Sequence, residues 1–134
     1  MSIHPLTFKE LREANVNRCH AVFHPLNSWS PTDWACAVAG EVGEACNLIK
    51  KARRGEPIER VAIAMELADA VIYLDLLAER LNIDLGAAVA EKFNTVSIRR
   101  RSSFRLHEHL STGLYGAPSI GRIVQDRDES NGDR

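Results

Sequence analysis

The sequence is poor in cysteine, in net charge and in uninterrupted apolar runs, and each shortage excludes a class of protein. Its three cysteines, Cys19, Cys36 and Cys46, form no CxxC pair. This argues against a disulfide framework or a zinc site and for reduced thiols in the cytoplasm. The net charge of -1 gives no general reason to expect binding to nucleic acid or to a membrane. Carboxylates interrupt the longest apolar stretches before these could cross a bilayer, so we expect a soluble protein.

The sequence also lacks the polar and apolar alternation of half-buried strands, so the expected fold is all-α. Thr7 and Glu10 have the spacing of a capping box and predict a first helix over about residues 8–21. Ser30 is an N-cap candidate for a second helix, which Gly55 is expected to end.

Two further helices are expected before residue 101. Pro57 is expected to open the third helix, and Asn82 to end it. Asp84 can cap the fourth helix. In this helix the apolar residues have the spacing of one buried face, and they are Leu85, Ala88, Val89, Phe93 and Val96. The short connections predict antiparallel neighbouring helices in a bundle.

We expect one helical domain over residues 1–101 and a polar tail over residues 102–134. Glycines and a proline are scattered through the tail, and its end is charged, which is typical of an extended or partly disordered segment. A tail that wraps its own subunit or a partner fits this composition as well as a direct functional role does.

Two acidic pairs are the strongest chemical signal in the sequence. Glu41 and Glu44 form one pair, and Glu66 and Asp69 form the other, each inside a mostly apolar stretch. Residues three apart project from one side of a helix, and a carboxylate in a core is costly unless it is paired or coordinates a cation. If the two helices pack antiparallel, the pairs meet, and four carboxylates suit Mg²⁺ or Mn²⁺.

Two alternatives to this magnesium site can be weighed from the sequence. A solvated acidic face is one, but it would leave both helices with no ordinary polar side. A di-iron bundle is the other, and it uses a histidine three residues after a glutamate. The residues at those places here are Glu44 and Asp69, which argues against iron and zinc.

Side chains that can donate hydrogen bonds to phosphate follow the acids along the chain. They are Asn47, Lys50 and Lys51 in the second helix, and Lys92, Asn94, Arg99 and Arg100 in or after the fourth. Structural roles compete with this interpretation. Lys92 can lay its stem along apolar surface with its ammonium group in water, and the lysines of the second helix place favourable charge near a helix C-terminus.

Trp34 is the first candidate for stacking against a nucleobase. It lies seven residues before Glu41, two helical turns away on roughly the same face. Packing against a neighbouring helix would explain this tryptophan equally well. No histidine and acid pair that could activate a serine is evident, so the expected chemistry needs no covalent nucleophile.

Taken together, these residues resemble the MazG-like, all-α nucleoside triphosphate pyrophosphohydrolases. The ExxE…ExxD signature of that family is matched by Glu41-Val-Gly-Glu44 and Glu66-Leu-Ala-Asp69, and the resemblance covers about residues 20–100. It implies Mg²⁺-dependent hydrolysis of a nucleoside triphosphate, a deoxynucleotide or a non-standard one, to the monophosphate and pyrophosphate. It further implies that the four acids are metal ligands and that one of them orients or deprotonates the attacking water.

The same resemblance implies further contacts and an assembly. Lys92 and Asn94 resemble phosphate or sugar contacts of the family, although the arginine that usually follows the asparagine is shifted here to positions 99–101. Phe23 and His24 resemble positions that line the base pocket of dCTP-cleaving relatives. Family members form homodimers or tetramers in which helices from two subunits complete a four-helix bundle.

Two other functions remain open at this stage. One is a non-catalytic helical module that binds nucleotide or metal to regulate a partner, with the tail as its contact segment. The other keeps the fold and cleaves a phosphoribosyl nucleotide of histidine synthesis, which requires a fuller basic pocket.

Overall fold

The computed structural model describes residues 4–106, and every regular element within this range is helical. In chain order the elements are α1 (Phe8–Arg18), a π-helical turn (Cys19–Phe23), a 3-10 turn (Leu26–Ser28), α2 (Pro31–Arg53), α3 (Arg60–Arg80) and α4 (Leu85–Arg99). The predicted all-α class is confirmed. Most of the predicted polar tail, from residue 107 on, lies outside the described residues. Within the described range, no helix has an apolar stretch long enough to span a bilayer.

The predicted helix starts at Thr7 and Ser30 are confirmed by reciprocal capping bonds. The Glu10 amide donates to Thr7 Oγ1 at 3.2 Å, and the Thr7 amide donates to Glu10 Oε2 at 3.0 Å. At the second start, the amide of Asp33 donates to Ser30 Oγ at 3.3 Å, and the Ser30 amide donates to Asp33 Oδ2 at 2.8 Å. These side chains satisfy amides that the first turn of a helix leaves without partners, and so fix where α1 and α2 begin.

The start of α3 differs from the prediction by three residues. α3 begins at Arg60, with Glu59 as its N-cap, so Pro57 lies in the connection before the helix. The chain has to reverse direction between α2 and α3, and the turn includes Gly55 at φ 90°, a conformation that is easily adopted by glycine. Residues 56–59 complete this reversal before helical geometry resumes. The predicted stop at Asn82 is confirmed, because its φ of 56° is left-handed.

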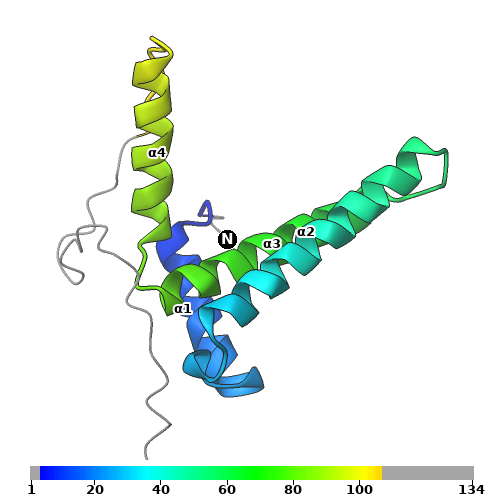
Figure 1. Ribbon diagram of the computed structural model, residues 1–134, viewed down its shortest axis with the longest axis horizontal. Coiled ribbons are helices and arrows are strands. Elements are labelled where there is room, and N and C mark those ends of the chain that lie inside the picture. The colour runs from blue at the N-terminus through cyan, green and yellow to red at the C-terminus, as the bar shows by residue number, and fades with distance from the viewer. Residues whose placement is uncertain (1–3, 107–134) are drawn as a thin grey trace, which may run out of the picture.

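α2 and α3 form an antiparallel hairpin that is the longest feature of the molecule (Figure 1). α1 packs against α3 near the base of the hairpin, which is the end farthest from the Gly55 turn. The core lies at this base and contains Cys19, Trp34 and Leu76, which are 2%, 1% and 5% exposed. The N–H of the Trp34 indole donates to the carbonyl of Leu26 at 3.1 Å, so this buried polar group has a partner.

α4 does not return along the hairpin, which corrects the prediction that all neighbouring helices are antiparallel. It leaves the base in a different direction (Figure 1) and contacts α1, where Phe8 lies against Gly86. The predicted buried face is only partly covered within the single chain, because Leu85, Ala88 and Val96 are half-buried while Val89 and Phe93 are 40% and 43% exposed. The spacing of these residues shows that α4 has an apolar face but does not show which surface covers it.

Candidate metal and nucleotide site

Three of the four predicted acids converge between α2 and α3. One carboxylate oxygen from each of Glu41, Glu66 and Asp69 lies within 4.8 Å of the other two. The antiparallel packing of the two helices produces this arrangement, because each helix turns its acidic pair toward the other. Glu41 and Glu66 are half-buried and Asp69 is exposed, so the cluster has one side open to solvent.

Glu44 belongs to the same electrostatic cluster. Partial burial raises the pKa of Glu41 above its ordinary value, and the charges of Glu44 and Asp69 raise it further. The pKa of Glu66 is raised by burial first and then by the charge of Glu44. Like charges this close disfavour full ionisation, and within residues 4–106 no ion pair joins these acids to a cationic side chain.

The donor set fits a small divalent cation. All the donor atoms are carboxylate oxygens, the ligands that Mg²⁺ and Mn²⁺ prefer, and neither histidine nor cysteine is among them. A bound cation would also remove the repulsion that raises the pKa values of Glu41 and Glu66. Mg²⁺ usually keeps part of its coordination shell for water and for substrate oxygens. The exposed side of the cluster leaves room for these ligands.

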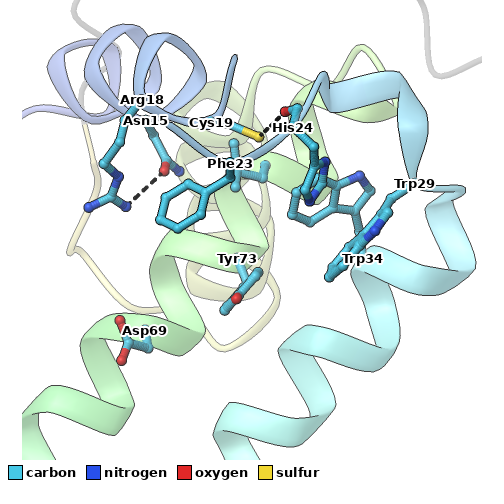
Figure 2. Close-up of a pocket in the computed structure, with 10 residues that line it drawn as sticks. Asn15, Arg18, Cys19, Phe23, His24, Trp29, Trp34, Asp69 and Tyr73 are labelled. Atoms are coloured by element: carbon cyan, nitrogen blue, oxygen red, sulfur yellow. Dashed lines mark hydrogen bonds between the residues drawn. The ribbon is translucent and has the colours of Figure 1, made fainter. Parts of the chain in front are cut away.

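A cleft of about 400 Å³ lies beside the acid cluster at the base of the hairpin. Its lining comes from α1, the π-helical turn, the segment before α2, and α2 and α3 themselves, and consists of Asn15, Arg18, Cys19, Phe23, His24, Trp29, Trp34, Asp69, Tyr73 and Leu76. Figure 2 shows these side chains around the opening. Asp69 is common to the cleft and the acid cluster, so a ligand in the cleft would reach the acids directly.

Aromatic rings form one wall of the cleft. The ring centroids of His24 and Trp29 are 4.8 Å apart, those of Trp29 and Trp34 are 4.7 Å apart, and Tyr73 continues the group at 6.1 Å from Trp34. His24 is fixed on its backbone side, where Nδ1 lies 2.8 Å from Ser28 Oγ and 3.1 Å from the carbonyl of Pro25. The rings are tilted against one another by 34° to 52°, and together they form an aromatic wall that a nucleobase can contact.

The predicted base-contacting residues are therefore together, with different exposures. Trp34 is only 1% exposed, so the packing role that competed for this residue is present even though its ring also borders the cleft. Phe23 is 69% exposed and His24 is half-buried. These two residues and Tyr73 offer the more accessible aromatic surface.

The predicted phosphate donors do not reach the cleft within one chain. Asn47, Lys50 and Lys51 lie on α2 past the acids, toward the Gly55 turn. Lys92, Asn94 and Arg99 lie on α4, with Arg100 at its C-cap, and α4 points away from the hairpin (Figure 1). None of the seven lines the cleft.

Asn94 has a partner in its own chain. Its Nδ2 donates to the carbonyl of Leu106 at 2.8 Å, and its Oδ1 accepts from the amide of Leu106 at 2.8 Å. This pair of bonds ties the segment after α4 to the helix. A sugar or phosphate contact by the same amide would require this pair to open.

Six residues of the cleft were not among the predicted site residues: Asn15, Arg18, Cys19, Trp29, Tyr73 and Leu76. Asn15 looked like an ordinary polar position on a surface helix, because its partners on α3 are about 60 positions away in the sequence, and Arg18 contacts Asn15 rather than α3. One available signal was Asp75, the third acid of the apolar α3 stretch, which is 1% exposed. A buried acid requires a partner, and here the partners come from α1.

Comparison with known proteins gives one consistent group of relatives. No family model matches the chain. The chain is 35% identical over 116 residues to dCTP pyrophosphatase 1 of Homo sapiens, a match that covers 74% of this chain and 68% of that protein. It is 34% identical over 110 residues to dCTP pyrophosphatase 1 of Rattus norvegicus, covering 74% and 61%. The counterpart from Bos taurus is 36% identical over 110 residues, covering 74% and 62%.

Proposed function

Because the chain belongs to the dCTP pyrophosphatase 1 family of all-α nucleoside triphosphate pyrophosphohydrolases, we propose that it hydrolyses dCTP to dCMP and pyrophosphate with Mg²⁺. The relatives' names supply the base and sugar of this proposal. Mn²⁺ is the other cation that suits the same donors.

The observation that carries the proposal is the place of Asp69. This carboxylate lies within the 4.8 Å cluster of acids and also lines the aromatic cleft. A nucleotide whose base occupies the cleft would therefore have its phosphates next to the oxygen ligands of a cation. Neither the acids alone nor the cleft alone would favour nucleotide hydrolysis this strongly.

The four acids Glu41, Glu44, Glu66 and Asp69 would hold the cation. A cation held there would supply positive charge for the phosphates and the departing pyrophosphate and would lower the pKa of a water molecule. One carboxylate orients the attacking water or accepts its proton.

The base is proposed to lie against Phe23, His24 and Tyr73, with Trp34 behind them as the packed wall. A fixed aromatic wall reduces the entropy lost on binding, because its side chains are already held in place. The contacts of His24 with Ser28 and the Pro25 carbonyl keep one ring nitrogen occupied and leave the other for a ligand.

We also propose that the active form is a homodimer or a homotetramer. The outer surfaces of α2 and α3 carry large exposed apolar side chains, among them Val61, Met65 and Leu67, which are 63%, 54% and 52% exposed. Exposed apolar side chains of this number and size are typical of an interface. A second subunit could also bring Lys92 and the α4 arginines to the phosphates, which one chain does not do.

Incubation with Mg²⁺ and a panel of nucleotides tests the proposed activity. The panel contains dCTP, CTP, dUTP, dTTP, dATP and dGTP, and products are separated by anion-exchange chromatography. We expect dCMP and pyrophosphate in equal amounts from dCTP, with slower turnover of the others. Orthophosphate as the only product would contradict the assigned bond, and binding without turnover would favour the regulatory module.

A further inference from the structure

A chain of buried polar groups runs from the core to the wall of the cleft. Asp75 is 1% exposed and accepts from Arg12 Nε at 2.9 Å. Its other oxygen accepts from Asn15 Nδ2 at 3.1 Å, and the same amide nitrogen donates to the carbonyl of Ile72 at 2.9 Å. Both donors of the Asn15 amide are thereby used. The orientation of this side chain, which is 3% exposed as a residue, is therefore fixed.

The fixed amide of Asn15 aims its oxygen at Arg18. Arg18 Nη2 donates to Asn15 Oδ1 at 3.3 Å, and Arg18 lines the cleft (Figure 2). One contact of this kind orients a guanidinium and leaves most of its five N–H groups available. Within residues 4–106, no ion pair joins Arg18 to a carboxylate. Arg18 is thus an exposed cation at the edge of the cleft, held at one point by Asn15 and without an ion pair within the described residues.

The position of Arg18 in the cleft indicates which part of a ligand it meets. In Figure 2, Arg18, Phe23 and Asp69 lie on one side of Tyr73, and Trp29 and Trp34 lie on the other. The two tryptophans therefore mark an aromatic end of the cleft, and both charged side chains lie at the opposite end. A nucleotide that stacks at the aromatic end would extend its phosphates toward the charged end, where the planar guanidinium can bind two phosphate oxygens at once.

We propose that Arg18 binds a phosphate group of the nucleotide substrate and that Asn15 and Asp75 are positioning residues that aim it. This inference rests on the proposed function and adds to it a cation that comes from the same chain as the cleft. The alternative role for Arg18 is a favourable charge at a helix C-terminus. This role explains Arg18 less well, because helical structure continues beyond it through the π-helical turn to Phe23.

The test compares ligands with and without phosphates on the variant Arg18→Gln. The ligands are deoxycytidine and the α,β-imido analogue of dCTP, each titrated by calorimetry in Mg²⁺. A hydrogen bond to a charged group contributes about 1.5–3 kcal/mol, so we expect the analogue to bind about 10- to 100-fold more weakly. Deoxycytidine should bind as it does to the wild type, because it has no phosphate for Arg18 to contact.

Three further variants separate positioning from folding. Arg18→Lys keeps the charge but not the planar fork, and its affinity for the analogue should fall between those of Arg18→Gln and the wild type. Asn15→Ala should show the same phosphate-dependent loss, smaller in size, with circular dichroism confirming its helices. Arg60→Gln removes an exposed arginine at the start of α3, away from the cleft, and should bind both ligands normally.

Equal losses for deoxycytidine and the analogue would overturn the assignment, because they would indicate a contact with the base or a structural role. An unchanged kcat/KM for dCTP in Arg18→Gln would also overturn it. If wild-type protein cleaved no nucleotide in the panel, the proposed function itself would fail. If the wild type cleaved dCTP and Arg18→Gln bound the analogue and turned over dCTP as the wild type does, only the inference about Arg18 would be refuted and the proposed function would stand.

Discussion

The two ends of the α2–α3 hairpin differ in how completely a single chain covers them. At the base, α1 closes over the helices, so that Trp34 and Asp75 are each 1% exposed. Toward the Gly55 turn the same helices expose Ile49, Val61 and Met65 by 49%, 63% and 54%. A single chain therefore completes the wall of the cleft at the base, whereas the outer part carries apolar side chains that nothing in residues 4–106 covers.

The acid cluster lies between these two regions and depends on both. Asp69 faces the finished cleft, while Glu41 and Glu66 are only half-buried. Under the proposed function, the closed base would orient the substrate and association would complete the surroundings of the acids. Changes at the two ends should therefore have separable effects.

The largest effect is expected from Asp69→Asn, which changes the residue shared by the cleft and the cluster. Loss of one charge-stabilising group in an active site costs about 10²–10³ in turnover. We expect at least this loss in kcat with dCTP and Mg²⁺, measured as pyrophosphate release. The fold should survive, because removing one acid from a like-charged cluster relieves repulsion.

Glu59→Gln is the matched control for that experiment. Glu59 is an exposed acid at the N-cap of α3, and its side chain makes no capping bond. Its turnover should remain within about twofold of the wild type, a free-energy change of only a few tenths of a kcal/mol. An Asp69→Asn protein as active as this control would show that the acids do not take part in the chemistry.

Next in size is the effect of Met65→Glu on the uncovered outer surface. Burying an unpaired carboxylate in an apolar interface is very unfavourable, so the variant should be monomeric at concentrations where the wild type is a dimer or tetramer. Light scattering after size exclusion measures the mass. Lys9→Glu, on the exposed side of α1, should leave the mass unchanged. A monomeric wild type would contradict the interpretation of this surface.

At the closed base, Asp75→Ala should lower the free energy of unfolding without changing the number of subunits in the assembly. It removes the buried partner of Arg12 and Asn15, and breaking a buried ion pair costs about 3–5 kcal/mol. Urea unfolding at fixed protein concentration measures this loss. Lys9→Ala breaks only the exposed pair with Glu13 and should cost less than about 1 kcal/mol. Similar values for the two variants would show that the buried network contributes little.

The smallest effect concerns pH and the acids themselves. Because the pKa values of Glu41 and Glu66 are raised in the folded chain, the folded state holds protons that the unfolded state has already released. Without metal, stability should therefore fall as the pH rises from the ordinary carboxyl range through these raised values. Mg²⁺ binds the deprotonated folded cluster and should restore stability at the upper end of this range.

Thermal unfolding in EDTA and in Mg²⁺ measures this dependence. The variant Glu66→Gln isolates the contribution of the cluster, since histidines and other acids titrate in both proteins. The wild type should lose more stability with rising pH in EDTA than the variant does. If stability in EDTA changed equally with pH in the two proteins, the acids would not repel one another measurably in the folded state.

Local signals predicted the helices well because they act within a few residues. Thr7 and Ser30 cap α1 and α2 as expected, and Asn82 ends α3. Pro57 failed as a helix start because the reversal after Gly55 takes more residues than a tight turn does. The amphipathic pattern of α4 was correct as a pattern, but periodicity contains no information about which surface covers a face.

The candidate site could be predicted in part, because the spacing within each acidic pair is also a local signal. The spacing of the acids and the antiparallel hairpin together place Glu41, Glu66 and Asp69 within 4.8 Å of one another. The cleft required contacts between residues far apart in the sequence, such as Asn15 with Asp75. No local rule links those positions.

Binding of Mn²⁺, followed by electron paramagnetic resonance in the presence of the α,β-imido analogue of dCTP, tests the central claim most directly. The account predicts saturable binding by the wild type that is lost in Asp69→Asn and retained in Glu59→Gln. Equal binding by the wild type and Asp69→Asn, or no binding by any of the three, would contradict it.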